Sequence, residues 1–121
     1  NEGYLAISNY VIEHSDPDDK VLLLGSGTAV TSYYRARRLA ASNYFYYANG
    51  RFSEEAKVSF ADQILRDMEE NHPRIILFAE ESKWNDFTQH LDDPQAFQDL
   101  LARDYTKDET PCAFAAYLYT G

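Results

Sequence analysis

The residues whose types best suit ligand chemistry are concentrated in one basic and aromatic block, residues 20–52. The charged residues of this block are all basic: Lys20, Arg35, Arg37, Arg38 and Arg51. Its tyrosines are Tyr33, Tyr34, Tyr44, Tyr46 and Tyr47. Guanidinium groups form charge-assisted, bidentate hydrogen bonds with phosphate or carboxylate groups, and tyrosine rings offer faces for stacking. The block therefore stands out from a chain whose formal net charge is −9.

Two interpretations of this block remain open. In the first, the block binds a phosphate or a carbohydrate, and the candidate residues are Tyr33, Tyr34, Arg35, Arg37 and Arg38. In the second, the tyrosines pack against the sheet and the arginines pair with acidic side chains of the surface. The first interpretation predicts an exposed guanidinium that no carboxylate engages, beside an exposed tyrosine ring and near the strand end at Gly25.

A glycine-containing turn, Gly25-Ser26-Gly27, follows the apolar run 21–24. Glycines at a strand end let backbone N–H groups approach a phosphate or a cofactor, so these three residues are candidate binding residues. The turn lacks a third glycine, the Lys-Ser/Thr pair of a P-loop, and an acidic residue roughly 20 positions later that would hold a ribose. A tight strand end is therefore the first interpretation. A Rossmann-like module for a nucleotide or another small molecule is the alternative, and a methyltransferase-like enzyme is the least supported.

Two adjacent carboxylates, Glu80 and Glu81, are the strongest acidic candidates for a binding site. They follow the apolar run 75–79, which is typical of a buried strand. Ligands of α/β proteins collect at the carboxyl ends of parallel strands. The other adjacent acidic pairs fall at expected helix starts and loops, where they indicate a solvated surface.

Neither a catalytic constellation nor a metal site is predicted. The histidines His14, His72 and His90 lack the i, i+4 partner of a zinc-binding helix, so each is interpreted as solvated or capping. Cys112 is the only cysteine, so it forms no disulfide within the chain and is interpreted as a small buried hydrophobic residue. We therefore expect no enzymatic activity from this chain alone and no cofactor.

The elements that position these residues alternate between helices and strands. Helices are expected at residues 2–14, 28–39 and 53–71, around Trp84, and from Asp93-Pro94 onward. Strands are expected at residues 20–25, 43–47, 74–79 and 112–119, with a short strand near Tyr105. This order predicts the α/β class, as a three-layer, Rossmann-like sandwich with a mainly parallel sheet of about four or five strands.

Length and composition limit the class of protein further. A chain of 121 residues, 45% of them hydrophobic, builds one domain, 1–121. The longest aliphatic run, 21–24, is far shorter than the roughly 18–20 apolar residues of a membrane span. The acidic net charge argues against duplex nucleic acid as the main partner. Because the chain starts at Asn1 with no signal pattern, we expect a soluble domain cut from a longer protein.

The string 25–46, with its Tyr33-Tyr34 and Arg37-Arg38 pairs and its aromatic run, resembles one known family. It is similar to the C-terminal extracytoplasmic domain of bacterial polytopic glycosyltransferases of the GT-C type, related to the dolichyl-phosphate-mannose protein mannosyltransferases. Later features follow the same order: a helix ending at Asn71-His72-Pro73, the strand 74–78, Tyr105 and a closing strand at 117–119. The resemblance covers nearly the whole chain.

The resemblance implies a parent enzyme in the bacterial cell membrane that moves a sugar from a polyprenyl-phosphate donor. Its catalytic acids would lie among transmembrane helices, so no catalytic residue is carried over to this chain. The domain would be a non-catalytic accessory that helps to position acceptor or glycan on the extracytoplasmic side. Its expected partners are the transmembrane part of the same chain and a lipid-linked sugar or glycan. The chain departs from the family at Ser26-Gly27-Thr28, where Trp or an acidic residue is common.

Overall fold

A computed structural model of the chain describes residues 3–25, 27–42 and 53–121. Its helices are α1 (Gly3–His14), α2 (Gly27–Ala36), α3 (Glu54–Asn71), α4 (Glu81–His90) and α5 (Pro94–Asp104). Its strands are β1 (Lys20–Leu24), β2 (Leu39–Ala40), β3 (Ile75–Phe78), β4 (Tyr105–Asp108) and β5 (Ala115–Tyr119). None of these helices combines the length and the apolar composition that crossing a lipid bilayer requires. The strand predicted at 43–47 lies outside the described residues.

The strands of the described residues form one mixed, 5-stranded sheet in the order β2-β1-β3-β5-β4. β1 lies parallel to β2 and β3, whereas β5 lies antiparallel to β3 and β4. The prediction of a mainly parallel, Rossmann-like sheet is therefore wrong. The reason is the short connection 109–114 between β4 and β5. A connection of this length joins neighbouring strands as an antiparallel hairpin, whereas a parallel pair needs a crossover of about a dozen residues or more.

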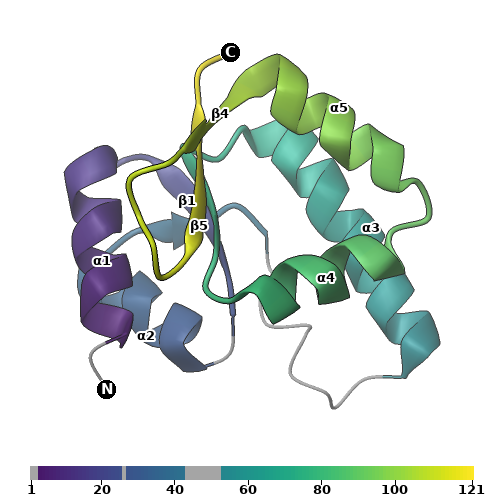
Figure 1. Cartoon of the computed structure of the whole chain (residues 1–121), viewed down its shortest axis with the longest axis horizontal. Helices are drawn as coiled ribbons and strands as arrows, with labels where there is room; N and C mark the ends of the chain where they lie inside the picture. The colour runs from purple at the N-terminus through teal and green to yellow at the C-terminus, as the bar shows by residue number, and fades with distance from the viewer. Residues whose placement is uncertain (1–2, 26, 43–52) are drawn as a thin grey trace.

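Helices cover both faces of the sheet, α1 and α2 on one side and α3, α4 and α5 on the other (Figure 1). Alternate residues of a strand point to opposite faces. Leu22 and Leu24 accordingly join the core that includes α3, α4 and α5, while Val21 and Leu23 join the core that includes α1 and α2. Because both faces of β1 and β3 are buried, their sequences are continuous apolar runs.

The helix predicted at 53–71 is confirmed as α3, and both of its ends are capped. Ser53 is the N-cap, and its hydroxyl accepts a hydrogen bond of 3.2 Å from the N–H of Ala56. At the other end, His72 has a left-handed backbone with φ 45° and donates its N–H to the Met68 carbonyl at 3.0 Å. These contacts satisfy backbone groups that a helix leaves free at its ends.

Candidate functional site

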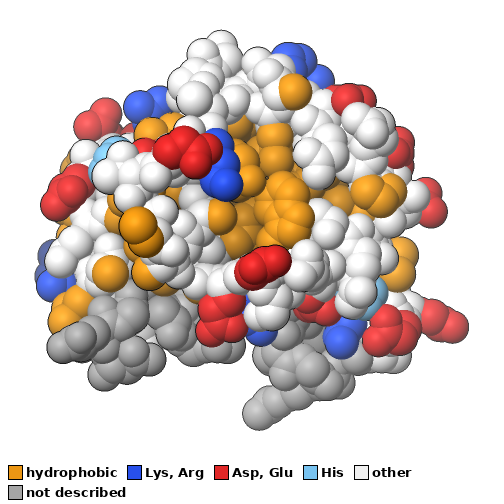
Figure 2. Space-filling model, viewed as in Figure 1, with side chains coloured by type: hydrophobic (Ala, Val, Ile, Leu, Met, Phe, Trp, Pro, Cys, Tyr) orange, Lys and Arg blue, Asp and Glu red, His pale blue; other side chains and the backbone are white. Residues whose placement is uncertain are grey.

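An open cleft of about 540 Å³ lies where β3 and β4 end and β5 begins. Figure 2 shows hydrophobic side chains exposed in the middle of this face, with acidic side chains around them. The strand ends meet because β5 is antiparallel to both neighbours. Ala115 of β5 pairs with Phe78, the last residue of β3, and Ala116 pairs with Asp108, the last residue of β4. The order of strands in the sheet thus brings distant parts of the sequence to one edge.

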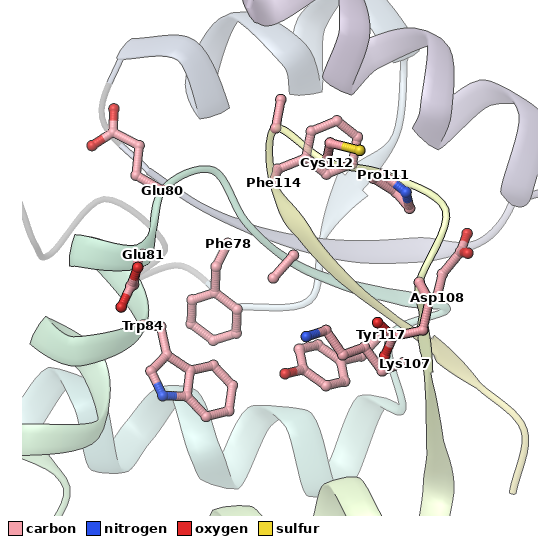
Figure 3. A pocket seen from close by; sticks show the side chains of 13 residues that line it. Phe78, Glu80, Glu81, Trp84, Lys107, Asp108, Pro111, Cys112, Phe114 and Tyr117 are labelled. Atoms are coloured by element: carbon pink, nitrogen blue, oxygen red, sulfur yellow. The ribbon is translucent and has the colours of Figure 1, made fainter.

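Aromatic rings form the apolar wall of the cleft (Figure 3). Trp84 of α4 stacks on Tyr117 of β5, with ring centroids 5.8 Å apart and ring planes inclined by 23°. Phe78 of β3 is buried and contacts Trp84 edge to face, with centroids 5.1 Å apart. Trp84 and Tyr117 each keep part of their surface exposed. The cleft therefore offers rigid aromatic surface that packing holds in place.

Acidic side chains project from the start of α4 at one rim of the cleft (Figure 3). Glu80 is the N-cap residue of α4, but its side chain makes no capping hydrogen bond. Its carboxylate instead accepts a hydrogen bond of 3.2 Å from the hydroxyl of Ser82. Glu81 lies in the first turn of α4, and both carboxylates are exposed. The structure thus places both sequence candidates at the carboxyl end of β3.

Asp108 fixes the opposite rim of the cleft. Its Oδ2 accepts a hydrogen bond of 2.7 Å from the Tyr10 hydroxyl, and its Oδ1 accepts one of 2.9 Å from the N–H of Thr110. These hydrogen bonds, the one from Tyr10 above all, lower the pKa of Asp108. Asp108 is therefore a positioning residue that holds the loop 109–114 beside α1. The neighbouring Lys107 lines the cleft and is exposed.

The sequence interpretation missed most of the residues that build this cleft. From the sequence, Trp84 is expected only as part of a helix, and Lys107, Asp108 and Tyr117 have no predicted role in a site. Cys112 also lies at the rim of the cleft, and it is exposed, so its interpretation as a buried hydrophobic residue is wrong. The reason is that β5 begins at residue 115, which leaves Cys112 in the connecting loop.

Close packing explains Gly25 without a ligand. A Cβ atom at this position would lie 2.9 Å from the Cβ of Ala79 and 3.3 Å from the Cβ of Ala29. A side chain here would therefore force apart β1, the end of β3 and the start of α2. Gly27 is the first residue of α2, and Ser26 lies outside the described residues. This is the tight strand end that the sequence favoured.

Tyr33 is a buried structural residue. Its hydroxyl accepts a hydrogen bond of 2.7 Å from the N–H of Leu23 and lies 3.5 Å from the carbonyl oxygen of Val21. The strand β2 pairs with β1 only as far as Val21, so the N–H of Leu23 lies beyond the end of this pairing. The Tyr33 hydroxyl takes the place of a strand partner for this N–H. Burial raises the pKa of Tyr33. The ring is therefore closed to a ligand, and the proposed binding role of this residue has no support in its position.

Arg38 is also structural, but its partners are not carboxylates. Its guanidinium donates to the hydroxyl and the carbonyl oxygen of Ser15 at 2.9 and 3.1 Å, and to the carbonyl oxygen of Ala36 at 2.8 Å. Arg38 thereby joins the end of α2 to the turn that follows α1. The interpretation that arginines of the block pair with surface acids is wrong for this residue.

Of the candidate binding residues of the block, Tyr34, Arg35 and Arg37 are exposed. Within residues 3–25, 27–42 and 53–121, neither Arg35 nor Arg37 has an ion-pair or hydrogen-bond partner for its side chain. These residues lie at the end of α2, whereas Gly25 precedes its start, and a 10-residue helix is about 15 Å long. The structure therefore separates these three exposed side chains from the glycine turn and from the cleft.

His90 is buried and joins two helices, so its interpretation as a solvated or capping residue is wrong. Its Nε2 lies 2.7 Å from a carboxylate oxygen of Glu54 at the start of α3, and its Nδ1 lies 2.6 Å from the carbonyl oxygen of Asp86. Burial by itself lowers the pKa of His90, but the hydrogen bonds to Asp86 and Glu54 outweigh it and the pKa is raised. In the described part of the chain, no group of three or more His, Cys, Asp and Glu side chains could hold a metal ion.

The cleft is thus the place where the described residues combine exposed aromatic rings, carboxylates and an ammonium group. Compared with known proteins, the chain matches no family model, no curated protein and no solved structure. The chemistry of the cleft is accordingly the main guide to function.

Proposed function

We propose that this chain is a non-catalytic accessory domain of a bacterial membrane glycosyltransferase and that its cleft binds a glycan. The observation that carries the glycan site is the combination of the stacked rings of Trp84 and Tyr117 with the carboxylates of Glu80 and Glu81. The proposal that the parent protein is a membrane enzyme rests on the resemblance of the sequence to a known family. In this proposal the domain lies on the extracytoplasmic side and contacts the transmembrane part of the same protein.

The chemistry of a sugar suits both parts of the cleft. A pyranose ring has apolar C–H faces that pack on aromatic rings, which here are those of Trp84 and Tyr117. Its hydroxyl groups donate hydrogen bonds, and ionised carboxylates are acceptors only, so Glu80 and Glu81 are suitable partners. An apolar wall with a few polar groups is the usual composition of a small-molecule site.

The charge of the cleft narrows the class of glycan. The charged side chains that line it are Glu80, Glu81, Asp108, Glu109 and Lys107. Because carboxylates outnumber the ammonium group, a phosphate or a uronic acid would be repelled, whereas a neutral or amine-bearing sugar would not. We therefore assign the cleft to the sugar part of an acceptor or glycan rather than to the phosphate of a lipid-linked donor.

The cleft supplies its own reporter, because Trp84 is the only tryptophan of the chain. The experiment is a fluorescence titration of Trp84 with four tetrasaccharides: mannotetraose, chitotetraose, the chitosan tetramer and tetragalacturonate. We expect saturable changes with the neutral or amine-bearing sugars and none with tetragalacturonate. Glu81→Gln should weaken binding about tenfold, the loss expected for a hydrogen bond to a charged group.

The matched control is Glu69→Gln, which neutralises an exposed carboxylate of α3 that does not line the cleft. It should bind the sugars as the unmodified chain does. No change of Trp84 fluorescence with any tetrasaccharide, or tighter binding of tetragalacturonate, would contradict the glycan site. Turnover of a sugar-phosphate donor by this chain alone would contradict the non-catalytic role.

The membrane parent is tested separately, by the gene that encodes the chain. We expect it to encode multiple hydrophobic spans before Asn1. A parent protein without such spans would contradict the proposal of a membrane glycosyltransferase. The alternative of a Rossmann-like nucleotide-binding module is weakened by Gly25, which packing explains, and by the carboxylates at the end of β3. Saturable quenching of Trp84 by ATP would favour that alternative.

A further inference from the structure

A second surface lies outside the cleft, where α2 ends and the edge strand β2 begins. It is an open groove of about 490 Å³ lined by Tyr34, Arg37 and Leu39 together with buried or structural neighbours. Tyr34 is 82% exposed and Leu39 is 71% exposed, the highest values among the large hydrophobic side chains of the described residues. We call Tyr34, Arg37 and Leu39 the β2-edge patch.

The backbone at Arg37 indicates that its side chain has a use. Arg37 has φ 56°, in the left-handed region that favours glycine. Its N–H bonds the Tyr34 carbonyl and the N–H of Arg38 bonds the Tyr33 carbonyl, both at 3.3 Å. This is the Schellman arrangement, in which the left-handed residue is usually glycine. It also ends α2 before residue 39, where the sequence predicted its end.

Arg37 thus occupies a position where glycine would fit the backbone better. Its side chain is exposed and has no ion-pair or hydrogen-bond partner among residues 3–25, 27–42 and 53–121. The guanidinium therefore contributes no polar contact to this part of the fold. A side chain that makes no polar contact does not compensate for an unfavourable backbone conformation. This combination at Arg37 points to a role in binding another molecule.

The charge around the patch selects its partner. The charged side chains that line the groove are Arg37 and Arg38, with no Asp or Glu among its described lining residues, whereas the chain as a whole has a net charge of −9. An anionic surface would therefore attract this patch and repel the rest of the domain. A tyrosine ring, a leucine side chain and a guanidinium side by side suit a lipid headgroup region, with apolar atoms below and a charge at phosphate level.

We propose that the β2-edge patch rests on the surface of an anionic lipid bilayer. Tyr34 and Leu39 enter the headgroup boundary, and Arg37 binds lipid phosphate. The acidic remainder of the domain then faces away from the membrane. This inference does not depend on the cleft or on the glycan.

The experiment measures co-sedimentation of the 121-residue chain with vesicles of phosphatidylcholine alone or of phosphatidylcholine and phosphatidylglycerol at 3:1. We expect a larger bound fraction with phosphatidylglycerol, which 0.5 M NaCl should abolish by screening. Arg37→Gly should reduce the bound fraction several-fold and raise the midpoint of thermal unfolding by about 2–6 °C, because glycine relieves the left-handed backbone.

Two further variants separate this inference from a general effect on stability. His72→Gly changes the other left-handed, non-glycine residue of the described chain, far from the patch in sequence, and should leave vesicle binding unchanged. The double variant Tyr34→Ser/Leu39→Ser should reduce vesicle binding without lowering thermal stability, because both side chains are exposed.

Three results would overturn the inference. The first is equal sedimentation with both vesicle types, and the second is undiminished binding by Arg37→Gly. The third is a dimer in lipid-free sedimentation velocity that Tyr34→Ser/Leu39→Ser dissociates, which would assign the patch to a second copy of the chain.

Discussion

The hydroxyl of Tyr10 donates a hydrogen bond of 2.7 Å to the carboxylate of Asp108, although the two residues are 98 positions apart. Tyr10 is also in edge-to-face contact with Phe114, with ring centroids 5.3 Å apart. The first helix of the chain is thereby fastened to the loop between its last two strands. This loop forms one rim of the cleft, so α1 supports a site to which it contributes little surface.

Removal of this hydrogen bond should loosen the rim of the cleft. We expect Tyr10→Phe to lower the midpoint of thermal unfolding by about 2–5 °C at pH 7, because Asp108 loses its hydrogen bond of 2.7 Å from the Tyr10 hydroxyl and keeps its contacts with Thr110 and His14. The low pKa of Asp108 means that its stabilisation is present above the unfolded pKa, near 3.8, and is lost as the pH falls below it. The difference between Tyr10→Phe and the unmodified chain should therefore shrink as the pH falls from 3.8 through the folded pKa of Asp108. A difference that does not change with pH would contradict this account.

The contact between His90 and Glu54 should make stability depend on pH. The raised pKa of His90 means that its contribution is fully present below pH 6.5 and is lost as the pH rises through the folded value. The lowered pKa of Glu54 means that its contribution is present above pH 4.5 and is lost at lower pH. Glu54→Gln should therefore destabilise most between these values and least at pH 9, as measured by thermal unfolding. Glu55→Gln, the neighbouring exposed carboxylate, is the control and should show no such dependence.

The buried strands should carry much of the stability. Leu23 and Ile76 are fully buried, so Leu23→Ala and Ile76→Ala should each lower the free energy of unfolding by about 2–5 kcal/mol. The same change at an exposed position, Leu39→Ala, should have little effect. Urea denaturation measures all three. A loss below about 1 kcal/mol at both buried positions would contradict the assignment of the core.

The hydroxyl of Tyr33 should matter for stability, and that of its neighbour should not. Tyr33→Phe keeps the ring but leaves the buried N–H of Leu23 without this partner. The expected loss in free energy of unfolding is about 1–3 kcal/mol, the cost of an unsatisfied buried donor. Tyr34→Phe removes a hydroxyl from an exposed ring and is the matched control. Equal effects of the two substitutions in urea denaturation would argue against the bond to Leu23.

The elements with strong local signals were predictable from the sequence. α3 combines an N-cap at Ser53 with an apolar stripe and a stop at Pro73, and its predicted range was confirmed. β1 and β3 are apolar on every buried position, which marks strands covered on both faces. The end of α2 was predicted too late, because no glycine or proline follows it and Arg37 adopts the left-handed backbone instead.

The order of strands and the cleft were not predictable in the same way. Apolar periodicity identifies a strand but not its neighbours, so nothing in the sequence placed β5 beside β3. Glu80 was found because it follows a strand directly, whereas Trp84 and Tyr117 meet only through that strand order. The basic and aromatic block is continuous in the sequence, but its residues have different environments in the structure. Tyr33 is buried and Tyr34 exposed because successive helical positions point about 100° apart.

The position of β5 has a consequence for folding while the protein is synthesised on the ribosome. β4 pairs only with β5 among the described strands, and β3 has β5 as its second neighbour. Until residues 115–119 have left the exit tunnel, β4 has no partner and one edge of β3 stays open. A nascent chain that ends before residue 115 therefore exposes unpaired strand edges and apolar surface, the features that recruit chaperones and promote aggregation. The sheet can therefore be completed only after β5, the last of the described strands to be synthesised, is available.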